Sequence, residues 1–419
     1  MRKTPVLSTL VAAMALALSG CASTTDAEVR DLVPTASPTP AETRPASVSF
    51  TAATADFSID LLKHVVDGQR NTLISPLSMQ LALAMTANGA SGQTLSQMEQ
   101  VLGGGMPIAT LNATLPGFAH SLPNTDRAKF HVANSVWYNQ ANGAKVEQSF
   151  LQTVADTYGA GAYAAPFNDQ TVNDINAWVN KNTDGMIPTM LSQLDPSDAM
   201  VLLNALAFDA TWAAPYTKNQ VSPGTFTDAA GQKQDATFMA STESSYLDDG
   251  QATGFAKSYD NDSYRFVALL PNENVSLTDY VASLTGDTLM TTLAHAQNAT
   301  VHASLPEFSF SYSMLMNNAL TAMGMPDAFT SSADFSRMGT MNGQPLSISQ
   351  VLHKTFIDVT PLGTRAGAAT AVIMGAGAVN GPVPKVVNLD RPFVFAIVDG
   401  KTNLPLFLGV VNTIDVTGN

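Results

Sequence analysis

Four polar residues, each in a predominantly apolar segment, could form a chemical site: Ser75, Ser78, Asn204 and His353. A buried polar group without a hydrogen-bond partner is costly, so we expect these side chains to contact one another. A serine and a histidine could also belong to a hydrolytic Ser-His-Asp set. No GxSxG nucleophile elbow occurs and no acidic partner is evident, so a buried polar cluster is the favoured interpretation.

The composition excludes several other kinds of site. The six histidines are scattered, only one cysteine is present, and no HExxH, CxxC or GxGxxG motif occurs, so we expect neither a metal nor a cofactor. The formal net charge of −14 argues against binding to nucleic acid, whose phosphates need a basic surface. The 419 residues, 45% of them hydrophobic, are enough for a large globular core.

The N-terminus has the pattern of a bacterial lipoprotein signal over residues 1–21. Basic residues precede an apolar stretch over 5–18, and Leu-Ser-Gly-Cys then ends at Cys21, the only cysteine. In such a lipobox the cysteine is lipidated and becomes the first residue of the mature chain, whereas the alternative is an ordinary signal peptide with an incidental cysteine. We therefore expect a lipid anchor on Cys21 in the bacterial cell envelope. The absence of an acidic residue after Ala22 favours the outer membrane.

Residues 22–47 are rich in Thr, Ser, Ala and Pro, a composition that cannot bury a core and predicts an extended tether. We expect one folded domain over 48–419. Its hydrophobic periodicity predicts mainly helices early in the chain and strands later in it. Helices are predicted at 57–66, 77–87, 94–102, 150–158, 171–181 and 314–323, and strands at 131–139, 200–208, 264–270, 302–312, 392–398 and 406–411. This order indicates an α+β fold with large antiparallel sheets.

Residues 363–374 form an unusual segment, Gly-Thr-Arg-Ala-Gly-Ala-Ala-Thr-Ala-Val-Ile-Met, with Arg365 as its only charge. It follows a strand-like stretch, and a second loose run continues to residue 384. Loops longer than about 12–15 residues are usually functional or disordered. Small side chains have little rotamer entropy to lose, so this segment could become a strand between two existing strands at low cost. The alternative interpretation is a mobile surface loop.

Several strings, in order and spacing, together resemble the serpin family of serine protease inhibitors from about residue 50 to the end. They are Asn71-x-x-x-Ser75-Pro76-Leu77-Ser78, Ile175-Asn176-x-Trp178-Val179, Thr183-x-Gly185-x-Ile187-Pro188, Leu203-Asn204-Ala205-x-x-Phe208-x-x-x-Trp212, Leu305-Pro306-x-Phe308, Met323-Gly324-Met325-x-Asp327-Ala328-Phe329, Ala333-Asp334-Phe335-Ser336, Arg391-Pro392-Phe393-Val394-Phe395 and Leu406-Phe407-Leu408-Gly409 before Val411-Asn412.

The resemblance implies a serpin fold, α+β with three β-sheets, eight or nine helices and an exposed reactive-centre loop, and a protein that is not an enzyme. In that family a protease cuts the loop and forms an acyl-enzyme, and the cut loop then inserts into the central sheet. The four polar residues correspond to the family's shutter beneath that sheet. Trp212 corresponds to the breach, where the loop first enters.

By the same resemblance, the proximal hinge of the loop consists of Gly363, Thr364, Arg365, Ala366, Gly367, Ala368, Ala369 and Thr370. Every second residue from Thr364 onward shares one face of the future strand, and all four on that face are small, as in inhibitory members. Arg365 departs from the family pattern, which usually has an acidic residue there. We expect its side chain to point to solvent after insertion.

The scissile bond is expected within Gly377, Ala378 and Val379. Counting forward from Gly363 places it at Gly377–Ala378, and counting back from Pro392 places it near residue 381. No Arg or Lys lies between residues 366 and 384, which argues against trypsin-like targets.

We expect elastase- or chymotrypsin-like serine proteases as partners in a covalent acyl complex, with cysteine proteases as a second class. The inhibitor itself is expected to be a monomer. The alternative function is a non-inhibitory serpin that acts as a binding or chaperone-like module.

Overall fold

A computed structural model describes residues 28–32, 45–364 and 383–414. The described residues form three β-sheets and the helices α1 to α9, which confirms the expected α+β fold. The helices are α1 (Val48–Val65), α2 (Pro76–Ala87), α3 (Gly92–Gly103), α4 (Ile108–Ser121), α5 (Gln148–Thr153), α6 (Asp169–Asn182), α7 (Leu277–Ser283), α8 (Gly286–Ala294) and α9 (Asn317–Met323).

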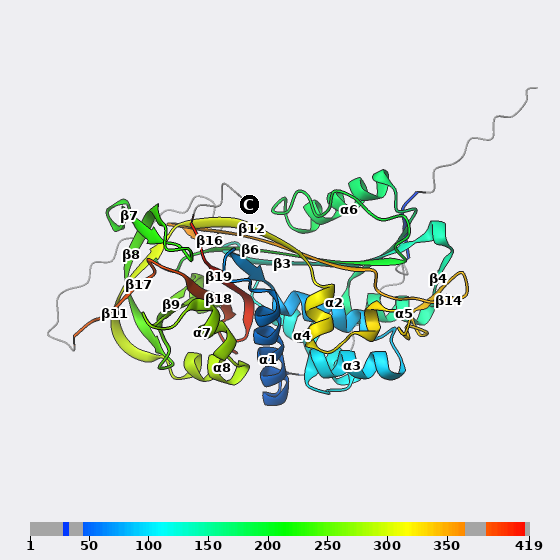
Figure 1. The fold of residues 1–419 in the computed structure, drawn as a ribbon, viewed down its shortest axis with the longest axis horizontal. Helices are drawn as coiled ribbons and strands as arrows, with labels where there is room; N and C mark the ends of the chain where they lie inside the picture. The colour runs from blue at the N-terminus through cyan, green and yellow to red at the C-terminus, as the bar shows by residue number, and fades with distance from the viewer. Residues whose placement is uncertain (1–27, 33–44, 365–382, 415–419) are drawn as a thin grey trace, which may run out of the picture.

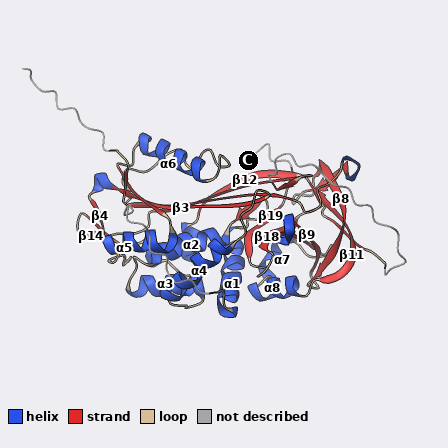
Figure 2. Ribbon diagram, turned by 180° about the vertical axis from the view of Figure 1, so that it is seen from behind, coloured by secondary structure: helices blue, strands red, loops and turns tan. Residues whose placement is uncertain are grey.

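The central sheet, called sheet A here, has seven strands in the order β1-β5-β3-β6-β16-β15-β12. These strands are β1 (Arg30–Asp31), β3 (Ala128–Asn139), β5 (Gly161–Ala165), β6 (Met200–Thr211), β12 (Phe308–Leu315), β15 (Gln350–Thr360) and β16 (Gly363–Thr364). The sheet runs along the long axis of the molecule, with α6 above one face and helices α2 to α5 below the other (Figure 1). The same layers are visible from behind in Figure 2.

A second sheet packs at one end of the molecule, in the order β17-β11-β8-β9-β10-β18-β19-β2 with β7 paired to β8. Its strands are β2 (Thr72–Ile74), β7 (Val221–Thr227), β8 (Lys233–Asp248), β9 (Ala252–Ser258), β10 (Tyr264–Pro271), β11 (Gln297–Pro306), β17 (Lys385–Asn388), β18 (Phe393–Asp399) and β19 (Pro405–Val411). The third sheet is small and contains β4 (Ala144–Val146), β13 (Gly339–Met341) and β14 (Gln344–Pro345).

Helix α2 begins where the sequence predicts it and lies directly beneath sheet A. The Ser75 hydroxyl accepts a hydrogen bond from the backbone N–H of Ser78 at 3.3 Å, and Pro76 occupies the first turn. Every residue of the helix is buried, which agrees with its lack of charged residues. The helix thereby holds Ser75 and Ser78 at the centre of the molecule.

The side chains of β6 alternate between the two faces of sheet A. Val201, Leu203 and Ala205 pack with α6 in one hydrophobic cluster. Leu202 and Leu206 pack into the main core on the other face. Because the side-chain period of a strand is two, Asn204 points to the core face, toward α2.

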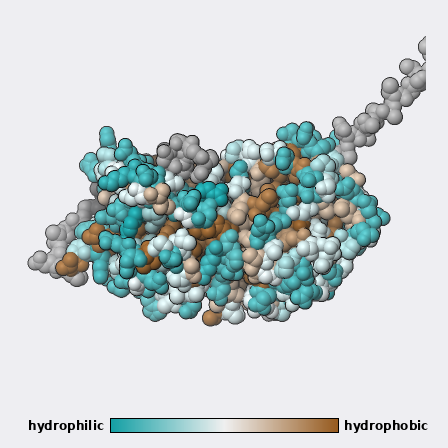
Figure 3. Space-filling model, viewed as in Figure 1, coloured by the Kyte–Doolittle hydropathy of each residue, from teal (hydrophilic) through white to brown (hydrophobic). Residues whose placement is uncertain are grey.

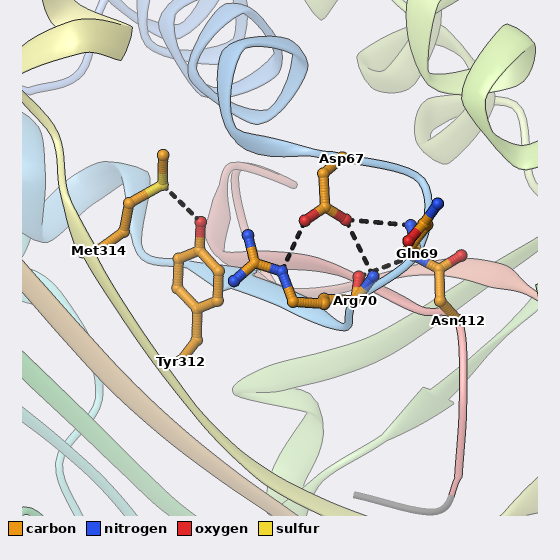
Figure 4. A network of polar contacts seen from close by, with 6 residues as sticks. All are labelled: Asp67, Gln69, Arg70, Tyr312, Met314 and Asn412. Carbon is orange, nitrogen blue, oxygen red and sulfur yellow. Dashed lines mark hydrogen bonds and ion pairs between the residues drawn. The ribbon is translucent and has the colours of Figure 1, made fainter. Parts of the chain in front are cut away.

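Two asparagines from distant motifs tie the closing hairpin to the turn after α1. The Asn71 carboxamide accepts the backbone N–H of Asn412 at 2.7 Å, and the Asn412 carboxamide donates to the carbonyl of Arg70 at 2.8 Å. Figure 4 shows this turn, in which the Asp67 carboxylate accepts the backbone N–H groups of Gln69 and Arg70. Residues more than 340 positions apart therefore fix the register of β2 against β19.

Residues 28–32 differ from the tether that their composition predicted. Arg30 and Asp31 pair with β5 at the edge of sheet A, and the N–H of Leu32 donates to the carbonyl of Ala162 at 2.8 Å. Val29 packs against the cluster beneath α6. An edge strand uses backbone groups that every residue carries, so composition alone does not reveal it.

On the face drawn in Figure 3, hydrophobic side chains form small patches that are separated by hydrophilic ones. Within the described ranges, no helix is both long and apolar enough to cross a membrane.

Candidate functional site

The first two hinge residues already form a short strand of sheet A. β16 lies between β6 and β15 and pairs antiparallel with both (Figure 1). Thr364 faces Ala210 of β6 and Val359 of β15, and only 1% of its surface is exposed. The chain therefore leaves β15, reverses through a tight turn and starts a new strand that points back along the sheet.

Further along the sheet, β6 and β15 pair directly with each other. Their parallel pairing joins residues 201–206 to residues 350–355 and places Asn204 opposite His353. Any strand that continued from β16 would have to separate these two strands. This pairing of β6 with β15 is called the seam here.

Trp212 fixes the turn that leads into the hinge. Its backbone N–H donates to the carbonyl of Leu362 at 3.0 Å, and its indole N–H donates to the carbonyl of Thr360 at 2.9 Å. The indole is fully buried and stacks on Tyr259, with ring centroids 4.3 Å apart. The structure thus places Trp212 beside the hinge, where the sequence predicted the breach.

A buried cation supports the same aromatic cluster. The Lys257 ammonium lies 5.6 Å from the Trp212 ring and 4.4 Å from the Tyr216 ring, and pairs with the Glu243 carboxylate at 2.9 Å. A buried charge needs such partners, and both aromatic faces are favourable for a cation. These contacts help to hold the indole in place.

The structure brings Ser75, Ser78, Asn204 and His353 together beneath the seam. The Asn204 carboxamide donates to the Ser78 hydroxyl at 2.5 Å and accepts from Nδ1 of His353 at 2.5 Å. The backbone N–H of Ser75 lies 3.2 Å from Nε2 of His353, and the Ser75 hydroxyl donates to the carbonyl of Leu406 at 2.8 Å. Three separate elements, α2, β6 and β15, are therefore linked by one polar network.

These contacts define the tautomer of His353. The Ser75 N–H can only donate, so Nε2 of His353 must be the unprotonated acceptor and Nδ1 must carry the proton. Complete burial lowers the pKa of His353 from 6.5 to about 3, because the charged ring would lose its hydration. The imidazole is thus neutral, and a second proton would place two donors opposite each other.

Asn134 is a further member of this network that the sequence did not indicate. Its carboxamide oxygen accepts from Asn204 at 2.6 Å, and its amide donates to the carbonyl of Ser78 at 3.3 Å. One signal was present, because Asn134 is a polar residue on the same face of its strand as Val132 and Val136. The network therefore extends beyond β6 to β3, a third strand of sheet A.

The geometry does not support a hydrolytic Ser-His-Asp set. Nε2 of His353 faces the backbone N–H of Ser75, while the Ser75 hydroxyl points to a carbonyl. Nδ1 of His353 bonds to the Asn204 carboxamide, and both Ser75 and His353 are buried. Within the described part of the chain no group of three or more metal-ligating side chains occurs.

The rest of the expected site lies outside the described residues. This applies to the hinge residues Arg365, Ala366, Gly367, Ala368, Ala369 and Thr370, to Gly377, Ala378 and Val379 of the reactive bond, and to Cys21.

Comparison with known proteins identifies the family of this fold. The family model described as "Serpin (serine protease inhibitor)" matches residues 52–414. An uncharacterized serpin-like protein of Thermococcus kodakarensis is 30% identical over 365 residues, covering 84% of this chain and 83% of that protein. Serpin B6 of Macaca fascicularis is 32% identical over 380 residues, covering 85% and 97%.

Solved structures agree with these sequence matches. The thermophilic serpin tengpin in its native state has a TM-score of 0.88 and 44% identity, covering 92% of this chain and 100% of that chain. The latent state of tengpin has a TM-score of 0.79 and covers 89% of this chain. The described fold is thus more similar to the native state than to the latent state of that protein.

Proposed function

The chain belongs to the serpin family, whose members are typically protease inhibitors and not enzymes, and we propose that it is a suicide-type inhibitor of serine proteases. In this proposal a protease cuts the reactive-centre loop and forms an acyl-enzyme. The freed loop then inserts between β6 and β15 of sheet A and carries the attached protease with it. This is β-strand addition, for which serpin loop insertion is a known example.

The observation that carries this proposal is the position of β16. Thr364 is paired on both sides, and each further loop residue in the same register moves back by one residue along β6 and along β15. Thr370 would then lie between Asn204 and His353, and Met374 would lie opposite Met200, the first residue of β6. The segment 363–374 therefore has the length of β6.

The two faces of the inserted strand would suit their surroundings. In this register Ala366, Ala368 and Thr370 share the core-facing side with Thr364, because their partners on β6 point to the core. Small side chains fit between packed strands without displacing them. The hinge composition therefore favours an inhibitor over the alternative of a non-inhibitory serpin.

Insertion would supply enough free energy to distort a protease. About ten new residues at roughly 3.3 Å each move the cut end by on the order of 30 Å. Roughly ten net ladder hydrogen bonds at about 1 kcal/mol each contribute about 10 kcal/mol. This is comparable with the stability of a whole domain, which is about 5–15 kcal/mol.

The expected targets follow from the residues around Gly377, Ala378 and Val379. Small and apolar side chains suit the pockets of elastase- or chymotrypsin-like enzymes, and the same loop could serve cysteine proteases. We further propose that lipidation of Cys21 anchors the inhibitor in the bacterial cell envelope, in the outer membrane. No other partner is required by this proposal.

Incubation with pancreatic elastase tests the proposed inhibition. We expect a covalent complex that survives boiling in SDS, and none with elastase whose active-site serine has been blocked. Clean cleavage of the loop without a complex would instead support a non-inhibitory serpin. Hydrolysis of an ester substrate that is lost in Ser75→Ala would contradict both interpretations.

A further inference from the structure

Tyr259 connects the second sheet to the hinge of sheet A. It follows β9 and lies against Trp212, with the two rings stacked at 11°. Its ring also makes an edge contact with Phe208 at 5.1 Å. Tyr259 is fully buried, so both faces of its ring are held by neighbouring side chains.

The hydroxyl of Tyr259 is aimed at the first buried hinge residue. Its oxygen lies 2.5 Å from Oγ1 of Thr364, and either group can donate the hydrogen bond. Within the described residues, neither hydroxyl has another hydrogen-bond partner, and Tyr259 and Thr364 are each 1% exposed or less. Burial also raises the pKa of Tyr259, so the phenol remains protonated and able to donate.

Removing one of these two hydroxyls should affect the hinge differently from removing both. If only one hydroxyl is removed, the other is left buried without a partner, which disfavours the docked hinge. If both are replaced by apolar groups of similar shape, the change is nearly neutral. When Thr364 leaves the sheet, water can bond to its hydroxyl. An unpaired hydroxyl on Tyr259 or on Thr364 would therefore disfavour the docked position of Thr364 specifically.

We propose that Tyr259 is a positioning residue for loop insertion: its hydroxyl holds Thr364 between β6 and β15, so that the inserting strand starts from a fixed register. This inference rests on the proposed inhibitory function. With Thr364 held, each following residue is added next to one that is already paired. If one hydroxyl is left buried without its partner, the docked position is disfavoured and the first residue must dock while the acyl-enzyme is already hydrolysing, so more inhibitor is cleaved without trapping.

Three variants test this role: Tyr259→Phe, Thr364→Val and the double variant. For Tyr259→Phe with elastase we expect the ratio of SDS-stable complex to cleaved inhibitor to fall roughly 5- to 30-fold, the factor that an unpaired buried hydroxyl implies. Thr364→Val should have a similar effect. The double variant should return to within about twofold of the wild type, because no hydroxyl is then left unpaired.

Tyr280→Phe is the matched control. Tyr280 is a buried tyrosine of helix α7, and this variant removes its hydroxyl, which donates to the Asp249 carboxylate at 2.6 Å. We expect this variant to trap elastase as the wild type does. Trapping by Tyr259→Phe equal to that of Tyr280→Phe, or a double variant no better than either single variant, would overturn the role of Tyr259.

Hydrogen exchange over residues 359–364 separates this inference from the proposed function. Exchange should be faster in Tyr259→Phe than in the wild type and in Tyr280→Phe, and should be slowed again in the double variant. This measurement needs no protease, so it still decides the role of the bond if the wild type forms no complex with elastase. Unchanged exchange in Tyr259→Phe would refute the role of the Tyr259 hydroxyl in holding Thr364.

Discussion

Replacing His353 by glutamine should remove much of the acid sensitivity of the seam in sheet A. In the native fold His353 is neutral, because Nε2 accepts from Ser75 and burial lowers its pKa from 6.5 to about 3. Below pH 6.5 the unfolded chain therefore binds a proton that the folded chain does not. The resulting stability is fully present above that pH and is lost as the pH falls from about 6.5 towards about 3.

The magnitude follows from the distance between the two pKa values. About pH 5 lies roughly 1.5 pH units below the pKa of the unfolded imidazole. Each unit corresponds to about 1.4 kcal/mol, so the free energy of unfolding falls by about 2 kcal/mol. Glutamine can accept from Ser75 and donate to Asn204 but does not titrate. Between pH 7 and about pH 5, the wild type should therefore lose about 2 kcal/mol more than His353→Gln.

Urea unfolding of both proteins at the two pH values measures this difference. Other titrating groups, such as His131, whose pKa is also lowered by burial, contribute equally to both proteins and cancel. An equal loss of stability in the wild type and in His353→Gln would refute the assignment of a neutral His353 at the seam.

Three further predictions concern the hinge and the N-terminus. Thr364→Arg should still be cut by elastase at the wild-type bond but form little SDS-stable complex, because a long cation must replace a side chain that is 1% exposed. Arg365→Glu should lower the yield of complex severalfold, since an inserted strand that continued the register of β16 would set position 365 between Asp209 of β6 and Asp358 of β15, and like charges repel by a few tenths to about 1 kcal/mol per pair; an unchanged yield would mean that these charges are screened by solvent after insertion, in line with the solvent-facing side chain that the sequence predicted. Cys21→Ala should give an unlipidated form, detected by the mass of the mature protein and by its loss from the membrane fraction, and unchanged fractionation would exclude the anchor.

The sequence was sufficient for those parts of the fold that depend on local signals. Ser75 and Pro76 are a cap and a first-turn proline, and the apolar run behind them can only be a buried helix, as α2 is. Asn204 could be recognised because it is the one polar residue in an apolar stretch of β6. His353 could be related to it only through the expectation that buried polar groups pair.

Long-range geometry explains what the sequence did not reveal. A long strand broken by Pro306 was predicted over residues 302–312, and the structure divides it at Glu307 into β11 and β12, which belong to different sheets. Proline cannot donate to a ladder, so Pro306 marked the break without showing that the chain changes sheet. Strands β8 and β9 were not predicted, because polar and small residues interrupt any regular alternation of apolar side chains in them.

The contact between Tyr259 and Thr364 was also beyond sequence reasoning. The two residues lie 105 positions apart, and neither stands in a pattern that indicates the other. A buried tyrosine is usually part of a core, and its hydroxyl becomes informative only when its partner is seen. The same holds for Asp209 of β6 and Asp358 of β15, which would flank position 365 only in an inserted strand that continues the register of β16.

Thermal unfolding before and after a single cut in the loop tests insertion most directly. Limited digestion with elastase should cut between residues 374 and 381 and release the segment 363–374 to continue from β16 along β6. We expect a clear rise in the melting temperature of the cleaved protein, because a fully paired central strand is added, and a much smaller rise in Thr364→Arg. An unchanged or lower melting temperature after cleavage of the wild type would contradict insertion, and with it the proposed mechanism of inhibition.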